Sequence, residues 1–471
     1  MTEFKQQWRK IISVCLNALA SEHKLVIEPI SETSIITETP PQPELGDIAF
    51  PMFPYARLFR TAPSRIADSL SSRIAAGTEY LKFGKPSPHG PYLNIRLNRS
   101  YIFDQVIRAV LAAKESYGCT TRLKKSRAMI EFSCPNTNKP LHLGHLRNDA
   151  LGESVARILK ANGADIRKVN LINDRGIHIC KSMLAYKRFG NGKTPESEGI
   201  KPDHFVGDYY ILFDKWVKQE PDADRQVREM LKDWENGVGE VTELWQTMNA
   251  WAVSGIEETY RKTGISFDMV YYESKTYRLG KEAVLQGLAN NVFYQDSDGS
   301  VWVDLKEIKL DKKVLLRNDG TSLYLTQDIG TAITRYKDWP FDRLIYVVAS
   351  EQQYHFKVLF YILEKLGFEW ARHLHHLSYG MVNLPEGKMK SREGAVVDAD
   401  DLLEELKAMA MEEIRSKGRE LIVGDIEKIS EAIALGALNY YLLQVSPYKD
   451  MIFKPEESIS FNGNTGPYLQ Y

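Results

Sequence analysis

Apolar runs alternate with helix-like segments through the middle of the chain. Runs typical of β-strands lie at residues 129–132, 168–173 and 343–349, and amphipathic segments separate them. Strands that alternate with helices in this way form parallel sheets. The pattern therefore predicts an α/β domain with a doubly wound parallel sheet over about residues 121–400.

The pattern becomes helical and polar between about residues 186 and 263. We interpret this stretch as a helical insertion that divides the parallel-sheet domain. Its tryptophans could stack on RNA bases, but their helical spacing favours packing into a core. They are Trp216, Trp234, Trp245 and Trp251.

Two further regions flank the predicted sheet domain. Residues 1–120 begin with a helical pattern, alternate like a strand at residues 90–97 and become helical again over about residues 101–114. This order predicts a separate, small α/β domain at the N-terminus. Residues 401–471 follow a helical pattern.

Length and composition indicate a globular protein. A chain of 471 residues exceeds one typical hydrophobic core, so two or three domains are expected. No apolar run approaches the roughly 20 residues needed to span a bilayer, and the charged N-terminus lacks a signal-peptide core. We therefore expect a cytoplasmic protein with no membrane segment.

The cysteines and the charge balance restrict the cofactors and partners. Four cysteines lie at positions 15, 119, 134 and 180 without C-x-x-C spacing, which argues against structural zinc and against a disulfide framework. The net charge is -1, so RNA would have to be held by local basic patches such as residues 122–127.

Two histidines surround a glycine where the first strand gives way to a helix. Pro135 and Pro140 interrupt the apolar run, His142 and His145 flank Gly144, and residues 146–159 are helical in pattern. Free N–H groups and the positive end of the dipole at a helix start favour anions. The segment therefore predicts a polyphosphate site, such as one for ATP, although such histidines alone could be caps or core residues.

Three later segments extend the candidate chemistry. Residues 387–394 read Gly-Lys-Met-Lys-Ser-Arg-Glu-Gly, which alone would be a solvated, charged loop. Residues 324–328 read Tyr-Leu-Thr-Gln-Asp, and residues 350–355 read Ser-Glu-Gln-Gln-Tyr-His. Together with residues 131–145, and in their order along the chain, these segments resemble the class I aminoacyl-tRNA synthetases, in the version found in arginyl-tRNA synthetases.

The resemblance implies a Rossmann-type catalytic domain and a two-step reaction. L-arginine would be activated with ATP and Mg²⁺, with activation dependent on tRNA, and the acyl group would then pass to tRNA(Arg), releasing AMP and pyrophosphate. Neither step needs an enzyme nucleophile, because positioning and electrostatic stabilisation suffice. A monomer is expected.

The resemblance also assigns the residues that meet ATP. The position usually held by a catalytic lysine in the second signature of other class I enzymes is Ser391 here. Arginyl-tRNA synthetases commonly lack that lysine and place another just before the histidine motif, where this chain has Lys139. The implied catalytic residues are His142, His145, Lys139 and Lys388, and the implied ATP-binding residues are His142, Gly144, His145 and Lys388.

Specificity for arginine requires carboxylates that meet a planar guanidinium. By the resemblance, the arginine-binding residues are Glu131, Ser133, Asn136, His142, Tyr324, Asp328 and Gln352. Separately, each could be ordinary: a helix cap for Asp328, a core aromatic for Tyr324, a surface amide for Gln352. The motif at residues 173–178 departs from the family at Arg175 and His178, and the sequence assigns these two residues no chemical consequence.

The regions outside the catalytic domain also receive roles from the resemblance. The N-terminal region, residues 1–120, resembles the additional tRNA-binding domain of the family, with Asn94 and Tyr92 as candidate RNA contacts or, alternatively, a strand residue and a packed aromatic. Residues 401–471 would be a helical connection and the start of a truncated anticodon-binding domain.

Other functions remain open at this point. Within enzymes, the alternatives are another class I synthetase or a small nucleotidyltransferase with the same histidine motif. From a different class, a catalytically silent paralogue would bind RNA or a regulatory partner, but the erosion of the histidines or acidic pocket expected of it is not seen.

Overall fold

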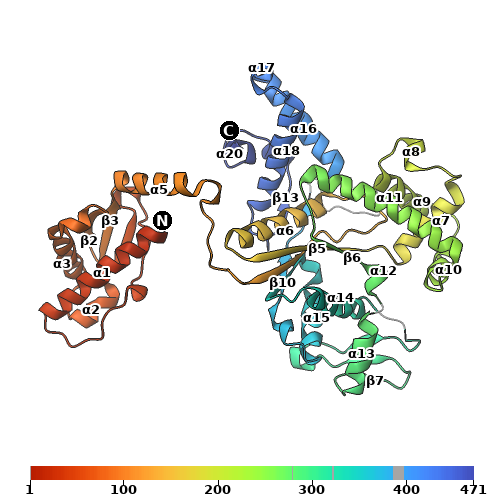
Figure 1. Cartoon of the computed structure of the whole chain (residues 1–471), viewed down its shortest axis with the longest axis horizontal. Helices are drawn as coiled ribbons and strands as arrows, with labels where there is room; N and C mark the ends of the chain where they lie inside the picture. The colour runs from red at the N-terminus through yellow and green to blue at the C-terminus, as the bar shows by residue number, and fades with distance from the viewer. Residues whose placement is uncertain (1, 278, 321–322, 384, 386–396, 471) are drawn as a thin grey trace. The chain divides into compact units, whose positions relative to one another are not determined.

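The computed structural model describes residues 2–277, 279–320, 323–383, 385 and 397–470. The chain forms two compact units, Met1–Gly118 and Cys119–Tyr471, which are drawn in Figure 1. Each unit has its own hydrophobic core. They are described separately below.

The N-terminal unit is a three-stranded antiparallel sheet covered by helices. The strand order is β1-β3-β2, and α1 and α3 bury residues such as Trp8 and Ile66 with Leu93 of the central strand. The predicted strand starts later than expected, because Gly90, at φ +53°, belongs to the turn between β2 and β3. The elements are α1 Thr2–Glu22, β1 Ile48–Pro51, α2 Phe53–Phe59, α3 Pro63–Ala76, α4 Thr78–Leu81, β2 Gly84–His89, β3 Tyr92–Leu97 and α5 Arg99–Ala113.

The second unit contains the predicted parallel sheet. Its five strands run in the order β11-β10-β4-β5-β6, and all four pairings are parallel. The chain builds outward from β4 in both directions, so the strand order reverses between β4 and β10. Ligands of open α/β sheets bind at the carboxyl ends of the strands near such a reversal. The strands are β4 Arg127–Glu131, β5 Asp165–Ile172, β6 Met269–Tyr272, β10 Arg343–Ala349 and β11 Leu374–Tyr379.

Both faces of this sheet are covered because side chains alternate along each strand. Ile130 packs with Leu151 of α6 (Leu143–Ala161) on one face. Its neighbour Met129 packs on the other face, with Ile329 of α14 (Tyr324–Asp338) and Leu359 of α15 (Gln353–Lys365). Figure 1 shows α6 and the α14–α15 pair on opposite sides of the strands. The doubly wound architecture is therefore confirmed.

The predicted insertion is helical and has its own core. It begins before the predicted residue 186, and it comprises α7 Ile177–Phe189, α8 Pro195–Glu198, α9 Pro202–Trp216, α10 Ala223–Glu235 and α11 Gly239–Thr263. Trp216 is buried in that core, and the other three tryptophans are partly buried against it. Packing, the interpretation favoured by helical spacing, is confirmed.

A small antiparallel sheet between β6 and β10 has no counterpart in the sequence predictions. Its strands have two, three and four residues, too few for a clear alternation of apolar and polar positions. The sheet and its neighbouring helices comprise α12 Glu273–Thr276, α13 Leu279–Ala289, β7 Tyr294–Gln295, β8 Val301–Val303 and β9 Lys313–Leu316.

The C-terminal part of the second unit is helical, as its pattern predicts. The helix α16 caps its own start with the side chain of Asp398, which accepts from the N–H groups of Asp400 and Asp401. The elements are β12 Val382–Asn383, α16 Ala399–Ser416, α17 Glu420–Val423, α18 Ile426–Leu443, β13 Met451–Ile452, α19 Pro455–Ser458 and α20 Gly466–Gln470. Across the described residues, no helix is both long and apolar enough to cross a membrane.

Candidate active site

The two signature histidines form the N-terminal cap of α6. The backbone N–H of Gly144 donates to Nδ1 of His142 (3.1 Å), and the backbone N–H of His142 donates to Nδ1 of His145 (3.2 Å). This is a capping box built from imidazoles. Because both Nδ1 atoms accept, each neutral ring carries its proton on Nε2.

The two imidazoles are held in the neutral state. Burial and the nearby Lys139 ammonium lower the pKa of His142 to about 4. Burial, together with His142 and Lys139, holds the pKa of His145 well below its ordinary value. Among the described residues, no hydrogen bond uses Nε2 of either ring. The start of α6 therefore presents two neutral N–H donors beside the positive end of a helix dipole.

The segment that carries the histidines is fixed by the start of α16. The N–H of Leu143 donates to the carbonyl of Val397 (3.1 Å), and the N–H of Ala399 donates to the carbonyl of Leu141 (3.0 Å). His142 and Asp398 form an antiparallel bridge between these bonds. Two helix N-termini are thereby held together at the site.

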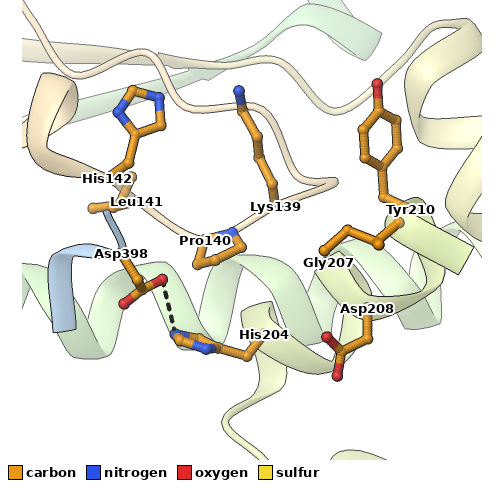
Figure 2. Close-up of a pocket in the computed structure, with 10 residues that line it drawn as sticks. Lys139, Pro140, Leu141, His142, His204, Gly207, Asp208, Tyr210 and Asp398 are labelled. Atoms are coloured by element: carbon orange, nitrogen blue, oxygen red, sulfur yellow. Dashed lines mark ion pairs between the residues drawn. The ribbon is translucent and has the colours of Figure 1, made fainter. Parts of the chain in front are cut away.

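A cavity of about 200 Å³ lies between this segment and α9. It is lined on one side by Lys139 and His142 and on the other by Gly207 and Tyr210. Figure 2 shows the Lys139 and His142 side chains pointing in the same direction, away from the His204–Asp398 pair. Burial lowers the pKa of Lys139.

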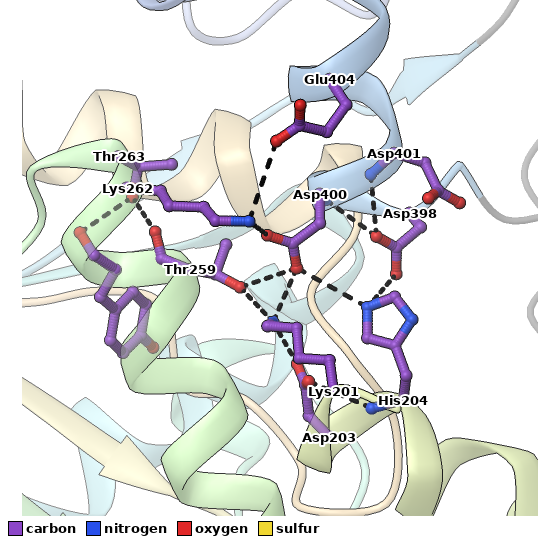
Figure 3. Close-up of polar contacts among 11 residues, drawn as sticks. Lys201, Asp203, His204, Thr259, Lys262, Thr263, Asp398, Asp400, Asp401 and Glu404 are labelled. Atoms are coloured by element: carbon purple, nitrogen blue, oxygen red, sulfur yellow. Dashed lines mark hydrogen bonds and ion pairs between the residues drawn. The ribbon is translucent and has the colours of Figure 1, made fainter. Parts of the chain in front are cut away.

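A charged cluster ties α9, α11 and α16 together behind this cavity (Figure 3). The Lys201 ammonium donates to Asp400 (2.7 Å), Asp203 (3.0 Å) and Thr259 (2.7 Å). His204 Nε2 lies 3.4 Å from Asp398 and 3.6 Å from Asp400. Burial opposes ionisation of Asp400, but hydrogen bonds from His204 and Lys201 lower its pKa overall.

Three members of this cluster have the donor types of a metal site. Ligand atoms of Asp203, His204 and Asp400 lie within 4.8 Å of one another. The Lys201 ammonium already contacts both carboxylates. It supplies the positive charge that a cation would bring, so we assign the cluster a structural role.

A second group of side chains gathers at the carboxyl ends of the parallel strands. Glu131 ends β4, Asp174 follows β5, Glu273 follows β6 and Gln352 follows β10. Asp328 on α14 is close enough to Glu131 and Glu273 to raise the pKa of both, after the larger effect of burial. The acidic residues expected for a guanidinium pocket are thus brought together.

Glu131 already meets a guanidinium of this chain. It is 5% exposed, and its carboxylate forms an ion pair with Arg335, which is 1% exposed. The Arg335 guanidinium also lies over the ring of Tyr271. This buried pair changes the expected role of Glu131, because its charge is compensated from within the fold.

Glu273 is an acidic residue of this group that the sequence analysis did not single out. It is buried, and burial raises its pKa to about 7. Gln327 lies between Glu273 and Arg175, and in the amide orientation that suits both it donates to Glu273 (2.7 Å) and accepts from Arg175 (2.9 Å). The sequence did offer one sign of Glu273: it directly follows an apolar strand, and the carboxyl ends of the strands form the edge where Glu131 was already expected.

Arg175 and His178, which the sequence analysis left without a chemical role, lie on either side of the start of α7. Arg175 precedes that helix and reaches Glu273 through Gln327, and His178 lies in its first turn. Arg175 pairs with Glu235 (2.7 Å), and its guanidinium lies 4.1 Å from the ring centre of Tyr277. His178 is kept neutral, because burial, with Lys139 and Lys181 nearby, lowers its pKa to about 4. Arg175 therefore supports the wall behind Glu273.

Asp328 has a different environment from the other two carboxylates. Its side chain is 33% exposed, and among the described residues its hydrogen-bond partner is Nε2 of His355, at 2.6 Å. Tyr324, one turn earlier on α14, is exposed, as is Gln352. Ser133 is buried and Asn136 is half-buried. Asp328 is thus the carboxylate of the group that is open to a ligand.

The remaining predicted residues have different outcomes. Lys388 and Ser391 of the second signature lie outside the described residues. Asn94 is 4% exposed, because it lies on the central strand of the N-terminal sheet, so it has almost no surface for RNA. Tyr92 is half-buried, with its ring edge-on to the exposed Phe53.

Comparison with known proteins identifies the class. Residues 106–454 match the family described as tRNA synthetases class I (R), catalytic domain, and residues 6–97 match the arginyl tRNA synthetase N-terminal domain. The fold and the histidine-capped helix are thus those of a class I aminoacyl-tRNA synthetase, a class that uses ATP.

Individual relatives narrow the class to one family. An arginine–tRNA ligase of Treponema denticola is 59% identical over 473 residues, covering 100% of this chain and 80% of the relative. One of Borrelia hermsii is 45% identical over 477 residues, with the same coverage of both chains. The chain belongs to the arginyl-tRNA synthetase family.

Solved structures show the same fold. The Thermus thermophilus arginyl-tRNA synthetase matches with a TM-score of 0.73 at 24% identity, covering 98% of this chain and 80% of that one. The Plasmodium falciparum enzyme matches with a TM-score of 0.69 at 18% identity, covering 99% and 78%.

The charged cluster predicts a pH-dependent stability. The pKa of Asp400 is lower in the folded chain than in the unfolded one, so its contribution is complete above the unfolded value and is lost as the pH falls. Asp400→Asn should lower the free energy of unfolding by about 2 kcal/mol at about pH 7, and by less below about pH 4. Urea unfolding at both pH values measures this, with the exposed Asp401→Asn as the matched control. Equal losses at both pH values would contradict the assignment.

Proposed function

We propose that this chain is an arginine–tRNA ligase that joins L-arginine to tRNA(Arg) in two steps. The carboxylate of arginine attacks the α-phosphate of ATP, which gives arginyl-adenylate and releases pyrophosphate. A ribose hydroxyl of tRNA(Arg) then takes the acyl group and AMP leaves. The observation that carries this proposal is the pair of neutral imidazoles capping α6, at the same sheet edge as the acidic group around Asp328.

The activation step needs negative charge on the phosphates to be stabilised. In this proposal His142 and His145 donate hydrogen bonds from Nε2 to phosphate or ribose oxygens, and Gly144 lets the nucleotide approach the helix start. Lys139, which lines the cavity beside His142, offsets charge as pyrophosphate departs. Mg²⁺ would neutralise the phosphate oxygens, and the resemblance of residues 387–394 to the second signature assigns Lys388 the same task.

Arginine recognition is assigned to the edge of the sheet. Asp328 is partly exposed and has His355 as its hydrogen-bond partner among the described residues, whereas Glu131 is paired with the guanidinium of Arg335. A carboxylate facing the guanidinium discriminates against substrates without that charge. The other proposed contacts are Glu131, Ser133, Asn136, His142, Tyr324 and Gln352. To these we add Glu273, because it is buried at the same edge of the sheet.

Binding of tRNA and the working state complete the proposal. We assign residues 1–120 to tRNA binding with Tyr92 as a contact, residues 121–400 to catalysis and residues 401–471 to the helical connection. The enzyme would act as a cytoplasmic monomer without structural zinc. In support, Cys15 and Cys180 are buried free thiols, and burial raises the pKa of both, which disfavours the thiolate that zinc requires.

Amino-acid-dependent ATP–pyrophosphate exchange tests the proposed function. In the presence of tRNA(Arg), arginine should support exchange by the full-length protein and lysine should not, because the lysine ammonium lacks the planar fork that the pocket is assigned to bind. The assay is run with each of the standard amino acids in turn. Exchange with a different amino acid, or none with arginine, would refute the proposal.

His142 can be separated into its two roles by substitution. His142→Asn retains a side-chain oxygen that can cap α6 but loses the Nε2 donor, whereas His142→Ala loses both. Both variants should lower kcat for exchange by about 10²–10³-fold, the usual effect of removing one preorganised donor. The Tm of His142→Asn should stay closer to that of the wild type. A normal kcat for His142→Asn would show that the cap, not the donor, is what matters.

Asp328 should control the affinity for arginine. Asp328→Asn should raise the KM for arginine by roughly 10- to 100-fold, as expected when a hydrogen bond to a charged group worth about 1.5–3 kcal/mol is lost. The KM for ATP should not change. Asp338→Asn is the matched control, because Asp338 lies at the far end of α14 and accepts from Tyr271 (3.0 Å). An unchanged KM for arginine would place the guanidinium elsewhere.

A further inference from the structure

The chain turns sharply between β4 and the histidine segment through two strained residues. Ser133 has a φ of 72° and Cys134 a φ of 49°. Side chains other than glycine enter this left-handed region at a cost of roughly 1–2 kcal/mol each. Among the described residues, this is the one place where two consecutive non-glycine residues have positive φ.

Two buried asparagines hold the backbone of this turn. The N–H of Ser133 donates to Oδ1 of Asn148 (2.6 Å). The N–H of Cys134 donates to Oδ1 of Asn170 (3.0 Å), and also lies 3.1 Å from the carbonyl of Phe132. Asn148 is 7% exposed and Asn170 is 1% exposed, so no solvent replaces either acceptor.

Each asparagine is itself held in one orientation. Nδ2 of Asn148 donates to the carbonyl of Val347 (2.8 Å) and to the Tyr379 hydroxyl (3.0 Å). Nδ2 of Asn170 donates to the Tyr260 hydroxyl (3.1 Å), which in turn meets Oγ of Ser133 (2.6 Å). These donor contacts point each Oδ1 at the turn and fix the amides without freedom to flip.

The turn sets the course of the segment that follows. After Cys134 the chain pairs with Asn173: the N–H of Asn173 donates to the carbonyl of Pro135 (2.9 Å), and the N–H of Thr137 donates to the carbonyl of Asn173 (3.2 Å). Asn136, Lys139 and His142 all lie on this segment. A change in the turn would therefore shift proposed arginine and ATP contacts together.

We propose that Asn148 and Asn170 are positioning residues for amino-acid activation, which lock the Ser133–Cys134 turn and so place the segment carrying Asn136, Lys139 and His142. This inference rests on the proposed function, because it concerns the same reaction. Neither asparagine contacts substrate in this account. They act through the hydrogen bonds that they accept from the backbone N–H groups of the turn. The loss caused by removing an asparagine should therefore shrink when the turn can keep its shape without that hydrogen bond.

A rescue experiment follows from the backbone geometry. Asn170→Ala should lower kcat for arginine-dependent exchange, measured with tRNA(Arg) well below Tm, by about tenfold or more, in line with the cost of misplacing reacting groups. Adding Cys134→Gly should recover most of that loss, because glycine adopts positive φ without support. Cys134→Gly alone should leave kcat within about twofold of the wild type.

A glycine substitution at a second position with positive φ tests whether the rescue is only a general effect of relieving backbone strain. Lys309 has a φ of 59° far along the chain, so Lys309→Gly relieves the same kind of strain outside the site. In the Asn170→Ala background it should not restore kcat. A kcat for Asn170→Ala within twofold of the wild type, or equal rescue by the two glycines, would overturn the proposal.

Failure of the proposed function gives a different result. If the wild-type chain showed no arginine-dependent exchange, the function would be refuted, and the turn would be tested by calorimetry with a non-hydrolysable ATP analogue, because Lys139 and His142 lie on the same segment. Asn170→Ala should weaken its binding, Cys134→Gly should restore it and Lys309→Gly should not. Equal affinities in all four chains would overturn the inference.

Discussion

Buried polar groups at the carboxyl edge of the parallel sheet must each have a hydrogen-bond or ion-pair partner. The groups that find this partner within the chain are satisfied, and the others are left to bind a ligand. The first case is the backbone between β4 and α6. Its N–H groups leave the sheet ladder before they join the helix, so side chains must accept from them. Asn148, Asn170, His142 and His145 do so. The histidines thereby become neutral caps that expose Nε2.

The carboxylates follow the same rule. Glu131 is deeply buried and is compensated by Arg335, while Glu273 is buried next to Gln327 and Arg175. Removing Arg335 or Arg175 would leave a buried carboxylate without its cation. That costs more stability than replacing both partners by apolar residues. Asp328 is less buried and is paired with His355. A substrate guanidinium would therefore find its best partner in Asp328, with the other two carboxylates adding to the negative field.

The parts of this site that depend on short stretches of sequence were predicted better than those that depend on contacts between distant residues. The strands at residues 129–132 and 343–349 and the histidines at a helix start follow from short stretches of sequence, and the structure confirms these placements. Glu273 was missed because β6 reaches the sheet only after the whole insertion. The asparagines were missed because positive φ at a serine and a cysteine leaves no mark in the sequence. Asn94 is buried because β3 is the central strand of its sheet. The alternation of apolar and polar residues along the strand does not reveal that position.

The most direct test of this account is the structure of the chain bound to a non-hydrolysable arginyl-adenylate analogue. The account predicts that the guanidinium lies within about 3 Å of an Asp328 carboxylate oxygen, with the Glu131–Arg335 pair intact and Nε2 of His142 directed at the phosphate mimic. A guanidinium bound to Glu131 or Glu273, with Asp328 still paired only to His355, would contradict it.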